Sequence, residues 1–301
     1  MKKLLFIFLA LALIGFVVLR CLPAEPAAPA ESETLLSEST PAPTPEPTPE
    51  PTPEPTPEPT PEPIPEPTPE PTPEPIPYVY HEDVPILMYH EVKDPVENIY
   101  YLSVDDFISH LEYIEEAGIT PISMQQLYDH WVNKAPIPDK PIVLTFDDGY
   151  VSMYNTVYPL LKERGWSGTF YCISSMRWAE NFLKVDMIEE MIEGGMEIGS
   201  HTNTHVNLRT ISGEEQYTEL SISRDELSAN VGFPITHLCY PFGGHTDETV
   251  SVALDLGYTC AVTTDYGFAN ESQGLMELQR LEVRAGYGAD WLKNALAPLG
   301  Y

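Results

Sequence analysis

Two adjacent carboxylates, Asp147 and Asp148, follow an apolar segment and are the first candidates for chemistry. The segment 142–146, IVLTF, has the composition of a buried strand, and Gly149 comes next as a turn residue. Side chains alternate along an extended chain, so the two aspartates point in different directions and can have different roles. Carboxylates leaving a buried strand are costly to desolvate unless a cation or proton donors meet them, and a divalent cation is the usual partner. A plain turn, in which Asp-Asp-Gly only satisfies backbone donors, is the alternative.

A second candidate group lies in the segment 197–208, EIGSHTNTHVNL, where His201 and His205 are four residues apart. If the loop turns once, as on a helical turn, both imidazoles can face one ion. One carboxylate and two histidines leave a coordination position open, as in catalytic zinc sites, where the metal lowers the pKa of water to about 7. A histidine pair on its own is more often an ordinary surface or core feature. Here, both groups follow strand-like segments of one alternating domain, which favours a shared site.

Several motifs in the same order resemble those of the polysaccharide deacetylases, the NodB-homology or carbohydrate esterase 4 family. They are TFDDG (145–149), SHTNTH (200–205), YPFG (240–243) and LQRLEV (278–283). The segment 85–92, PILMYHEV, resembles the branch that contains biofilm poly-N-acetylglucosamine deacetylases. The resemblance extends from Val84 to the C-terminus. It implies a distorted (β/α)7 barrel and metal-dependent removal of acetyl groups from N-acetylated sugars.

The resemblance also implies roles for single residues. Asp148, His201 and His205 would hold a divalent metal ion, for which we expect zinc. Asp147 would be the general base that takes a proton from the attacking water. The backbone N–H of Tyr240 occupies the position that matches a donor to the tetrahedral oxyanion.

The chain departs from the common family pattern in two places. Many members have an arginine in the third motif that pairs with the base, and the matching residue here is Cys239, which cannot replace a guanidinium. A late motif in those members supplies a histidine as general acid, where this chain reads LQR. We hypothesise that Arg280 orients Asp147 and that His90, just after the first strand, protonates the leaving amine. A packed core histidine is the alternative for His90, and His245 is a second candidate for the acid.

Composition divides the chain, which has 301 residues, 32 prolines and a net charge of -31. Residues 1–21 carry Lys2 and Lys3 before an apolar run and predict a signal peptide or signal anchor, so we expect an exported protein at the cell surface, membrane-anchored or secreted. Arg20 argues against lipidation of Cys21. Residues 22–83 predict a disordered, extended linker of PTPE repeats, because proline at every second position forbids both a helix and a sheet ladder.

Residues 84–301 are long enough for one domain with a sizeable core. Short apolar runs alternate with helical patterns; for example, Ser103 caps a helix with Phe107, Leu111 and Ile114 on one face. This alternation predicts an α/β fold with a parallel sheet and right-handed crossovers. Because several motifs directly follow strands, a closed or nearly closed barrel with its site at the carboxyl-terminal rim fits best, and a doubly wound open sheet is the alternative.

Charge bears on the partners of this domain. Residues before Tyr78 hold 3 of the 15 basic and 12 of the 46 acidic residues, which leaves the remainder with a net charge of -22. Such a surface argues against nucleic acid and is compatible with a neutral polysaccharide or a product that gains amines, although solubility explains it equally well. Tyr240 is our selection among the aromatic residues that could stack on sugars, which are Tyr89, Tyr150, Tyr240, Phe242 and Trp291.

The function expected is that of a metal-dependent N-deacetylase that acts, as a monomer, on an extracellular N-acetylglucosamine polymer. Poly-N-acetylglucosamine, peptidoglycan and chitin-like chains all remain open as substrates. An O-acetyl glycan esterase is an alternative, because the same metal site would attack esters. A non-catalytic glycan-binding surface module is another, and Asp147 argues against it because metal binding alone does not need that residue.

Overall fold

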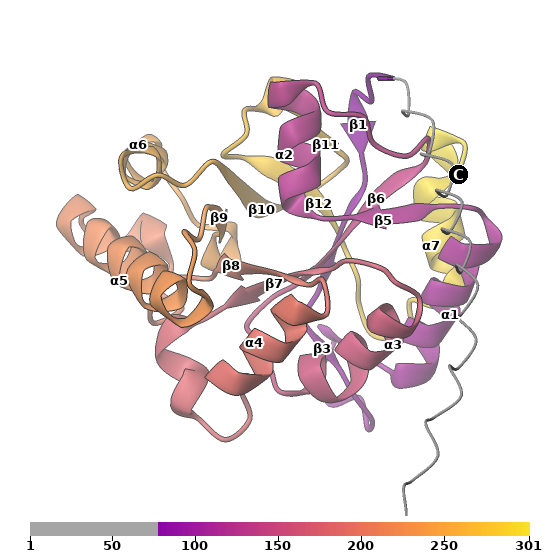
Figure 1. The fold of residues 1–301 in the computed structure, drawn as a ribbon, viewed down its shortest axis with the longest axis horizontal. Helices are drawn as coiled ribbons and strands as arrows, with labels where there is room; N and C mark the ends of the chain where they lie inside the picture. Colours follow the sequence, from indigo (N-terminus) through magenta and orange to yellow (C-terminus); the bar gives the residue numbers. More distant parts are fainter. Residues whose placement is uncertain (1–77) are drawn as a thin grey trace, which may run out of the picture. The chain divides into compact units, whose positions relative to one another are not determined.

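A closed ring of parallel strands forms the centre of the computed structural model, which describes residues 78–301 (Figure 1). Around the ring the seven strands are β2 (Ile86–Tyr89), β12 (Leu278–Glu282), β10 (Cys260–Tyr266), β9 (His237–Cys239), β8 (Glu197–Ser200), β7 (Thr169–Cys172) and β6 (Pro141–Phe146). Pairing between β2 and β6 closes the ring, and an eighth strand, β5 (Thr120–Ile122), pairs with the first half of β6. The predicted (β/α)7 barrel is confirmed, and the closure excludes the open sheet.

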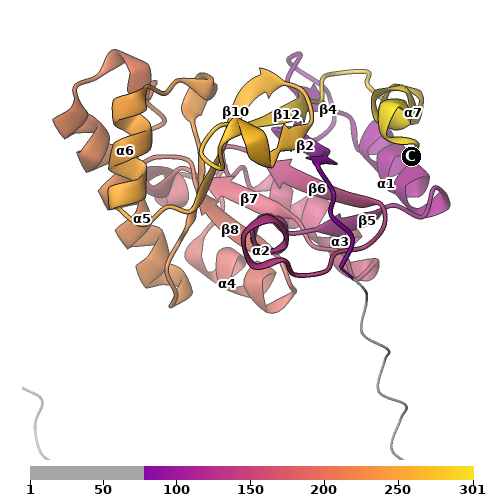
Figure 2. The same cartoon turned by 90° about the horizontal axis from the view of Figure 1, so that it is seen from above.

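Helices surround the barrel and connect its strands. They are α1 (Val104–Glu116), α2 (Met124–Asn133), α3 (Tyr158–Glu163), α4 (Val185–Glu193), α5 (Gly213–Val231), α6 (Asp247–Asp255) and α7 (Ala289–Leu296). α5 packs beside α6 on one side of the barrel, and α1 packs beside α7 on the other, as Figure 1 and Figure 2 both show. Two small strand pairs complete the fold, β1 (Asp83–Val84) with β11 (Ala269–Asn270) and β3 (Glu91–Val92) with β4 (Tyr101–Leu102).

Alternate residues of each strand belong to two separate apolar layers. On β6, Val143 joins the cluster inside the barrel, whereas Leu144 joins the larger cluster between the barrel and the helices. All six residues of β6 are buried because both faces of the strand are covered. The predicted helix after Ser103 is confirmed as α1: Ser103 accepts a hydrogen bond from the Asp106 N–H, and Phe107 is among the buried residues of the predicted face.

Helix α2 covers the amino-terminal end of the barrel. Its Leu127 and Trp131 belong to the interior cluster. Glu197, the first residue of β8, accepts hydrogen bonds from the N–H groups of Met124 and Gln125 at 2.9 and 3.0 Å, which places a carboxylate at the positive end of the helix. Neither β5 nor α2 was expected from the sequence. With this end closed, the carboxyl-terminal ends of the strands form the open rim.

The expected signal segment (1–21) lies outside the described residues, as does most of the expected linker (22–83), so that division stays a prediction. Residues 78–83 are described and contact the domain. The Tyr80 hydroxyl donates to Glu271, and the Trp131 indole N–H donates to the His81 carbonyl. Within residues 78–301, no helix is both long and apolar enough to cross a membrane.

Candidate active site

Asp147 continues the face of β6 that points into the barrel. Val143 lies in the interior cluster, and Thr145 and Asp147 follow it at every second position. Arg280 reaches Asp147 from β12: Nη1 lies 2.8 Å from Oδ1, and Nη2 lies 2.8 Å from Oδ2. Arg280 is 0% exposed and Asp147 is 2% exposed. The structure therefore brings these two predicted residues together as a buried, bidentate ion pair.

All five N–H donors of Arg280 have acceptors. Besides the two bonds to Asp147, the guanidinium donates to the Thr263 carbonyl, the Thr145 hydroxyl and the Cys239 sulfur at 2.8, 3.0 and 3.3 Å. Burial alone would raise the pKa of Asp147, but the charge and hydrogen bonds of Arg280 outweigh it and hold the pKa below its ordinary value. Asp147 is therefore ionised at neutral pH, as a general base must be.

Asp148 faces two imidazoles. Its Oδ1 lies 3.4 Å from Nε2 of His201 and 3.3 Å from Nε2 of His205. One ligand atom from each of the three residues lies within 4.8 Å of the other two. Burial opposes the ionisation of Asp148, but the hydrogen bonds and charges of the two histidines outweigh burial and lower its pKa. The residues predicted to share a site are thus gathered around one point.

The loop that carries both histidines is held at two places. Nδ1 of His201 lies 2.8 Å from the carbonyl oxygen of Cys239, so this nitrogen carries the proton and Nε2 is left for Asp148. Thr204 is bound to Glu219 of α5 through its N–H at 2.8 Å and through its hydroxyl at 2.7 Å. The loop is therefore fixed before any ligand arrives.

Unusual backbone conformations concentrate at this site. Within residues 78–301, five non-glycine residues have a positive φ, and four of them lie here: Asp148 (73°), Thr202 (62°), His205 (61°) and Phe242 (59°). Each such residue costs roughly 1–3 kcal/mol unless its surroundings enforce it, and such residues cluster at functional sites. The sequence allowed both histidines to face one ion if the loop turned once, as on a helical turn. The structure has no helix between them, and Thr202 and His205 have left-handed backbone conformations.

Comparison with known proteins shows which family the barrel resembles. The family model for polysaccharide deacetylases matches residues 134–261. The Streptococcus pyogenes deacetylase PplD in complex with acetate has a similar structure, with a TM-score of 0.67 and 28% identity, over 71% of this chain and 97% of that chain. Residues 134–261 therefore form a polysaccharide deacetylase domain. With relatives and structural neighbours of the same kind, the protein is a hydrolase of the polysaccharide N-deacetylase class.

Two relatives show how far the similarity extends. YxkH of Bacillus subtilis (strain 168), which is named provisionally as a polysaccharide deacetylase, is 29% identical over 203 residues, which are 67% of this chain and 72% of that protein. The poly-beta-1,6-N-acetyl-D-glucosamine N-deacetylase of Escherichia coli (strain K12) is 23% identical over 240 residues, covering 64% of this chain. This deacetylase spans only 35% of the length of the Escherichia coli protein.

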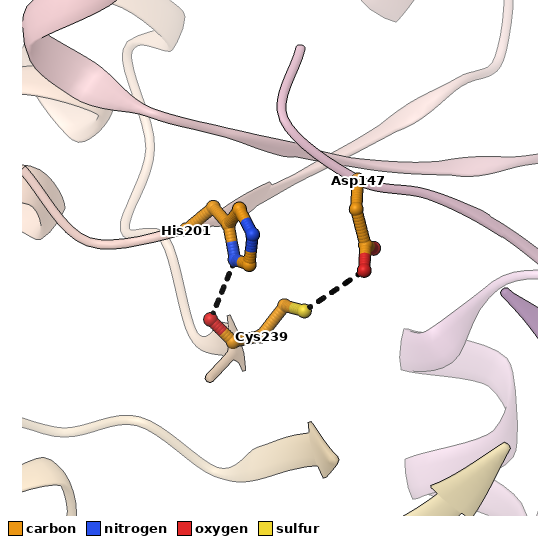
Figure 3. A group of neighbouring side chains, drawn as sticks. All are labelled: Asp147, His201 and Cys239. Carbon is orange, nitrogen blue, oxygen red and sulfur yellow. Dashed lines mark hydrogen bonds between the residues drawn. The ribbon is translucent and has the colours of Figure 1, made fainter. Parts of the chain in front are cut away.

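Two groups of side chains within residues 78–301 could be considered for a metal ion, and they share His201. The first, Asp148, His201 and His205, has the nitrogen and oxygen ligands of a catalytic zinc site and presents Nε2 of both imidazoles to one carboxylate oxygen. The second, Asp147, His201 and Cys239, is drawn in Figure 3. A cation does not fit the second group, because the Arg280 guanidinium already contacts both Asp147 and Cys239.

A cleft of about 390 Å³ opens above these residues. The predicted site residues that line it are His90, Asp147, Asp148, His201, His205 and Tyr240. His90 is largely buried, its ring is tilted against that of Tyr100 with centroids 5.4 Å apart, and its buried Nδ1 has no hydrogen-bond partner. Burial lowers the pKa of His90, and the carboxylates of Asp147 and Asp148 oppose that shift. His90 thus lies at the cleft, and its role as the acid stays a prediction.

Tyr240 and His245 both make contacts that bear on the roles considered for them. The N–H of Tyr240 donates to the Val262 carbonyl at 3.2 Å, so an oxyanion would have to share this donor. The rings of Tyr240 and His245 stack with centroids 4.7 Å apart. Nδ1 of His245 faces the Gly243 carbonyl and Nε2 faces Glu277, each at 3.0 Å, so neither ring nitrogen is free to act as the acid.

Aromatic side chains form much of the cleft wall. Phe242 is 64% exposed, and its ring meets that of His205 with centroids 4.7 Å apart. Tyr150 also lines the cleft. Tyr240, the residue expected to stack on a sugar, is 0% exposed and its ring packs on that of His245, so it offers no face to a sugar. Tyr89 is buried beside Phe107, and Trp291 stacks on Tyr287 of the α7 region. The cleft residues Tyr100 and Tyr101 were not expected from the sequence. Their adjacent aromatic rings, shortly after the first strand of the barrel, were the available signal.

Proposed function

We propose that this protein removes N-acetyl groups from a poly-N-acetylglucosamine chain outside the cell, with the help of a divalent metal ion. The observation that carries the proposal is the ionised Asp147 of the Arg280 pair, placed next to the three-ligand group of Asp148 and two histidines at the base of an open cleft. The relatives named poly-beta-1,6-N-acetyl-D-glucosamine N-deacetylase in Escherichia coli and Staphylococcus aureus support this choice of polymer. The apolar segment and repeat predicted before residue 78 support export.

Asp148, His201 and His205 are the residues that would hold the metal ion, with zinc preferred for this nitrogen and oxygen ligand set. When bound, such an ion polarises the acetyl carbonyl and makes a water molecule easier to deprotonate. The Cys239 carbonyl supports the site because it fixes His201 with Nε2 toward Asp148.

Asp147 takes the proton from the attacking water. Arg280 donates one hydrogen bond to each carboxylate oxygen of Asp147, and this bidentate contact fixes the orientation of the carboxylate at the cleft. The same guanidinium keeps Asp147 ionised despite its burial. Arg280 therefore acts as a positioning residue, and it supplies from β12 what the third motif of this chain lacks.

His90 gives a proton to the leaving amine. It lines the same cleft as Asp147. Because burial lowers the pKa of His90, the imidazole is neutral in the free protein at neutral pH and must gain a proton before it can act. The Tyr240 N–H remains the proposed oxyanion donor, shared with the Val262 carbonyl.

The deciding experiment measures acetate release from β-1,6-linked N-acetylglucosamine oligomers by the full chain, with zinc and with a chelator. We expect release that requires the metal and is abolished by Asp147→Asn. His90→Ala is expected to reduce turnover sharply without loss of metal. Asp255→Asn, at an exposed position of α6, is the matched control and should behave as the unsubstituted protein.

Three results would contradict the proposal. Release that persists in Asp147→Asn would remove the base, and unchanged turnover in His90→Ala would remove the acid. Release of acetate from O-acetylated glycans but not from the N-acetylglucosamine oligomers would assign the site to an esterase.

A further inference from the structure

Cys239, the last residue of β9, contacts both the proposed base, Asp147, and the proposed metal ligand His201. It is a free cysteine with 0% exposure. Its sulfur lies 3.4 Å from Oδ2 of Asp147, and its carbonyl oxygen lies 2.8 Å from Nδ1 of His201, as the dashed lines in Figure 3 show. From the sequence, a thiol at this position cannot replace a guanidinium. In the structure the guanidinium comes from another strand, and the thiol contacts the base as well.

The direction of the hydrogen bonds follows from the groups involved. Nη2 of Arg280 lies 3.3 Å from the Cys239 sulfur, and a guanidinium has only donors, so the sulfur accepts that bond. The single thiol proton is then left for the carboxylate of Asp147, which has only acceptors when it is ionised. Oδ2 of Asp147 therefore receives donors from two directions, Arg280 and Cys239.

We propose that Cys239 is a positioning residue that fixes the carboxylate of Asp147 through its thiol, while its carbonyl fixes the tautomer of His201. This inference rests on the proposed function, in which Asp147 is the base. The guanidinium holds the two oxygens of Asp147 on one side, and the thiol adds a second direction of restraint. The side chain of Cys239 thus orients the base, Asp147, and its backbone carbonyl orients the metal ligand, His201.

This division gives a specific expectation for substitutions. Cys239→Val fills the space with apolar atoms and removes the donor, but it keeps the carbonyl that His201 needs. We expect its kcat to fall about tenfold, the order expected for one hydrogen bond to a charged group, while KM and zinc affinity stay unchanged. Cys239→Ser keeps a donor and should retain most of the activity. Cys260→Val, at another buried interior cysteine on the neighbouring strand β10, is the matched control and should leave kcat unchanged.

A second measurement does not depend on activity. The S–H stretching band of Cys239 in the infrared spectrum of the full chain is identified by its disappearance in Cys239→Val. A band lowered in frequency by hydrogen bonding, which moves upward in Asp147→Asn because a neutral amide is a weaker acceptor than a carboxylate, supports the contact. A band at the same frequency in the unsubstituted chain and in Asp147→Asn overturns it.

The kinetic outcomes are equally decisive. Cys239→Val with the kcat of the unsubstituted chain overturns the proposal, as does a Cys239→Ser variant that falls as far as Cys239→Val. A fall in zinc affinity together with kcat would show a structural role at the metal ligands instead. If the unsubstituted chain releases no acetate, the proposed function and the catalytic role of Cys239 both fail, and the infrared band still decides the contact with Asp147.

Discussion

Replacing Arg280 by Met should destabilise the domain and disable its base. Arg280 is fully buried and uses all five N–H donors, so the substitution leaves the carboxylate of Asp147 buried without a counter-charge. Removing one partner of a buried ion pair costs about 3–5 kcal/mol. For a domain of this size, each kcal/mol lowers Tm by roughly 2–4 °C, so we expect a decrease of about 6–20 °C.

The pH dependence of this effect follows from the pKa of Asp147. In the unsubstituted protein the folded pKa is lowered, so the stability that Asp147 contributes is present above its unfolded pKa of about 3.9 and is lost as pH falls through the lower folded value. Without Arg280, burial dominates and raises the folded pKa, so ionised Asp147 destabilises the variant at neutral pH. The difference between the two proteins should therefore be largest near neutral pH and shrink toward acidic pH.

Urea unfolding, followed by tryptophan fluorescence with chelator present, measures this difference. Arg284→Met is the matched control, because Arg284 has a side chain 46% exposed and pairs with Glu282, and such a pair contributes about 0–1 kcal/mol. The double variant Asp147→Asn with Arg280→Met should lose less stability than the sum of the two single variants. If Arg280→Met is as stable as Arg284→Met, or if the losses simply add, the reasoning about this ion pair is wrong.

Three further predictions concern the metal site and the barrel. His205→Ala removes one of the three proposed ligands and should weaken zinc binding by more than about a hundredfold in a titration of chelator-treated protein; equal affinity would exclude His205 as a ligand. Gly199→Ala places a Cβ 2.5 Å from the Tyr171 ring and should lower the unfolding free energy by about 1–3 kcal/mol, whereas an unchanged Tm would mean that the ring moves freely. Glu197→Gln removes a carboxylate whose pKa lies below its ordinary value, because His237 and hydrogen-bond donors outweigh burial. The stability that this carboxylate contributes is present above about pH 4.3 and is lost below it, so the loss in stability caused by the substitution at pH 7 should shrink near pH 3. A loss in stability that does not depend on pH would contradict the assignment.

The local patterns of the sequence predicted much of the fold. The apolar run before Asp147 forms the predicted strand, β6, and Ser103 caps the predicted helix, α1. Residues 119–141 gave no assignment, although they form β5 and α2. β5 has only three residues and contains Pro121, so no period can be read from it, and α2 is positioned by burial against the barrel and by Glu197.

The site was predicted in its residue types but not in its geometry. Asp147, Asp148 and the two histidines were identified as site candidates from the sequence, because these acids and imidazoles directly follow strand-like segments. The contact of Cys239 with Asp147 could not be predicted, since it depends on how two strands of the barrel face each other. The positive φ of His205 could not be predicted either, because non-glycine residues persist in this conformation only where their surroundings enforce it.

The sequence by itself determined which side chains stand at strand ends, because alternation along β6 places Thr145 and Asp147 on one face whatever the fold. Only the tertiary structure decided what that face meets. Closure of the ring between β2 and β6 turned the face inward, where Arg280, 133 positions away, could reach Asp147. A buried carboxylate needs a counter-charge, and nothing in the local sequence specifies from which strand it comes.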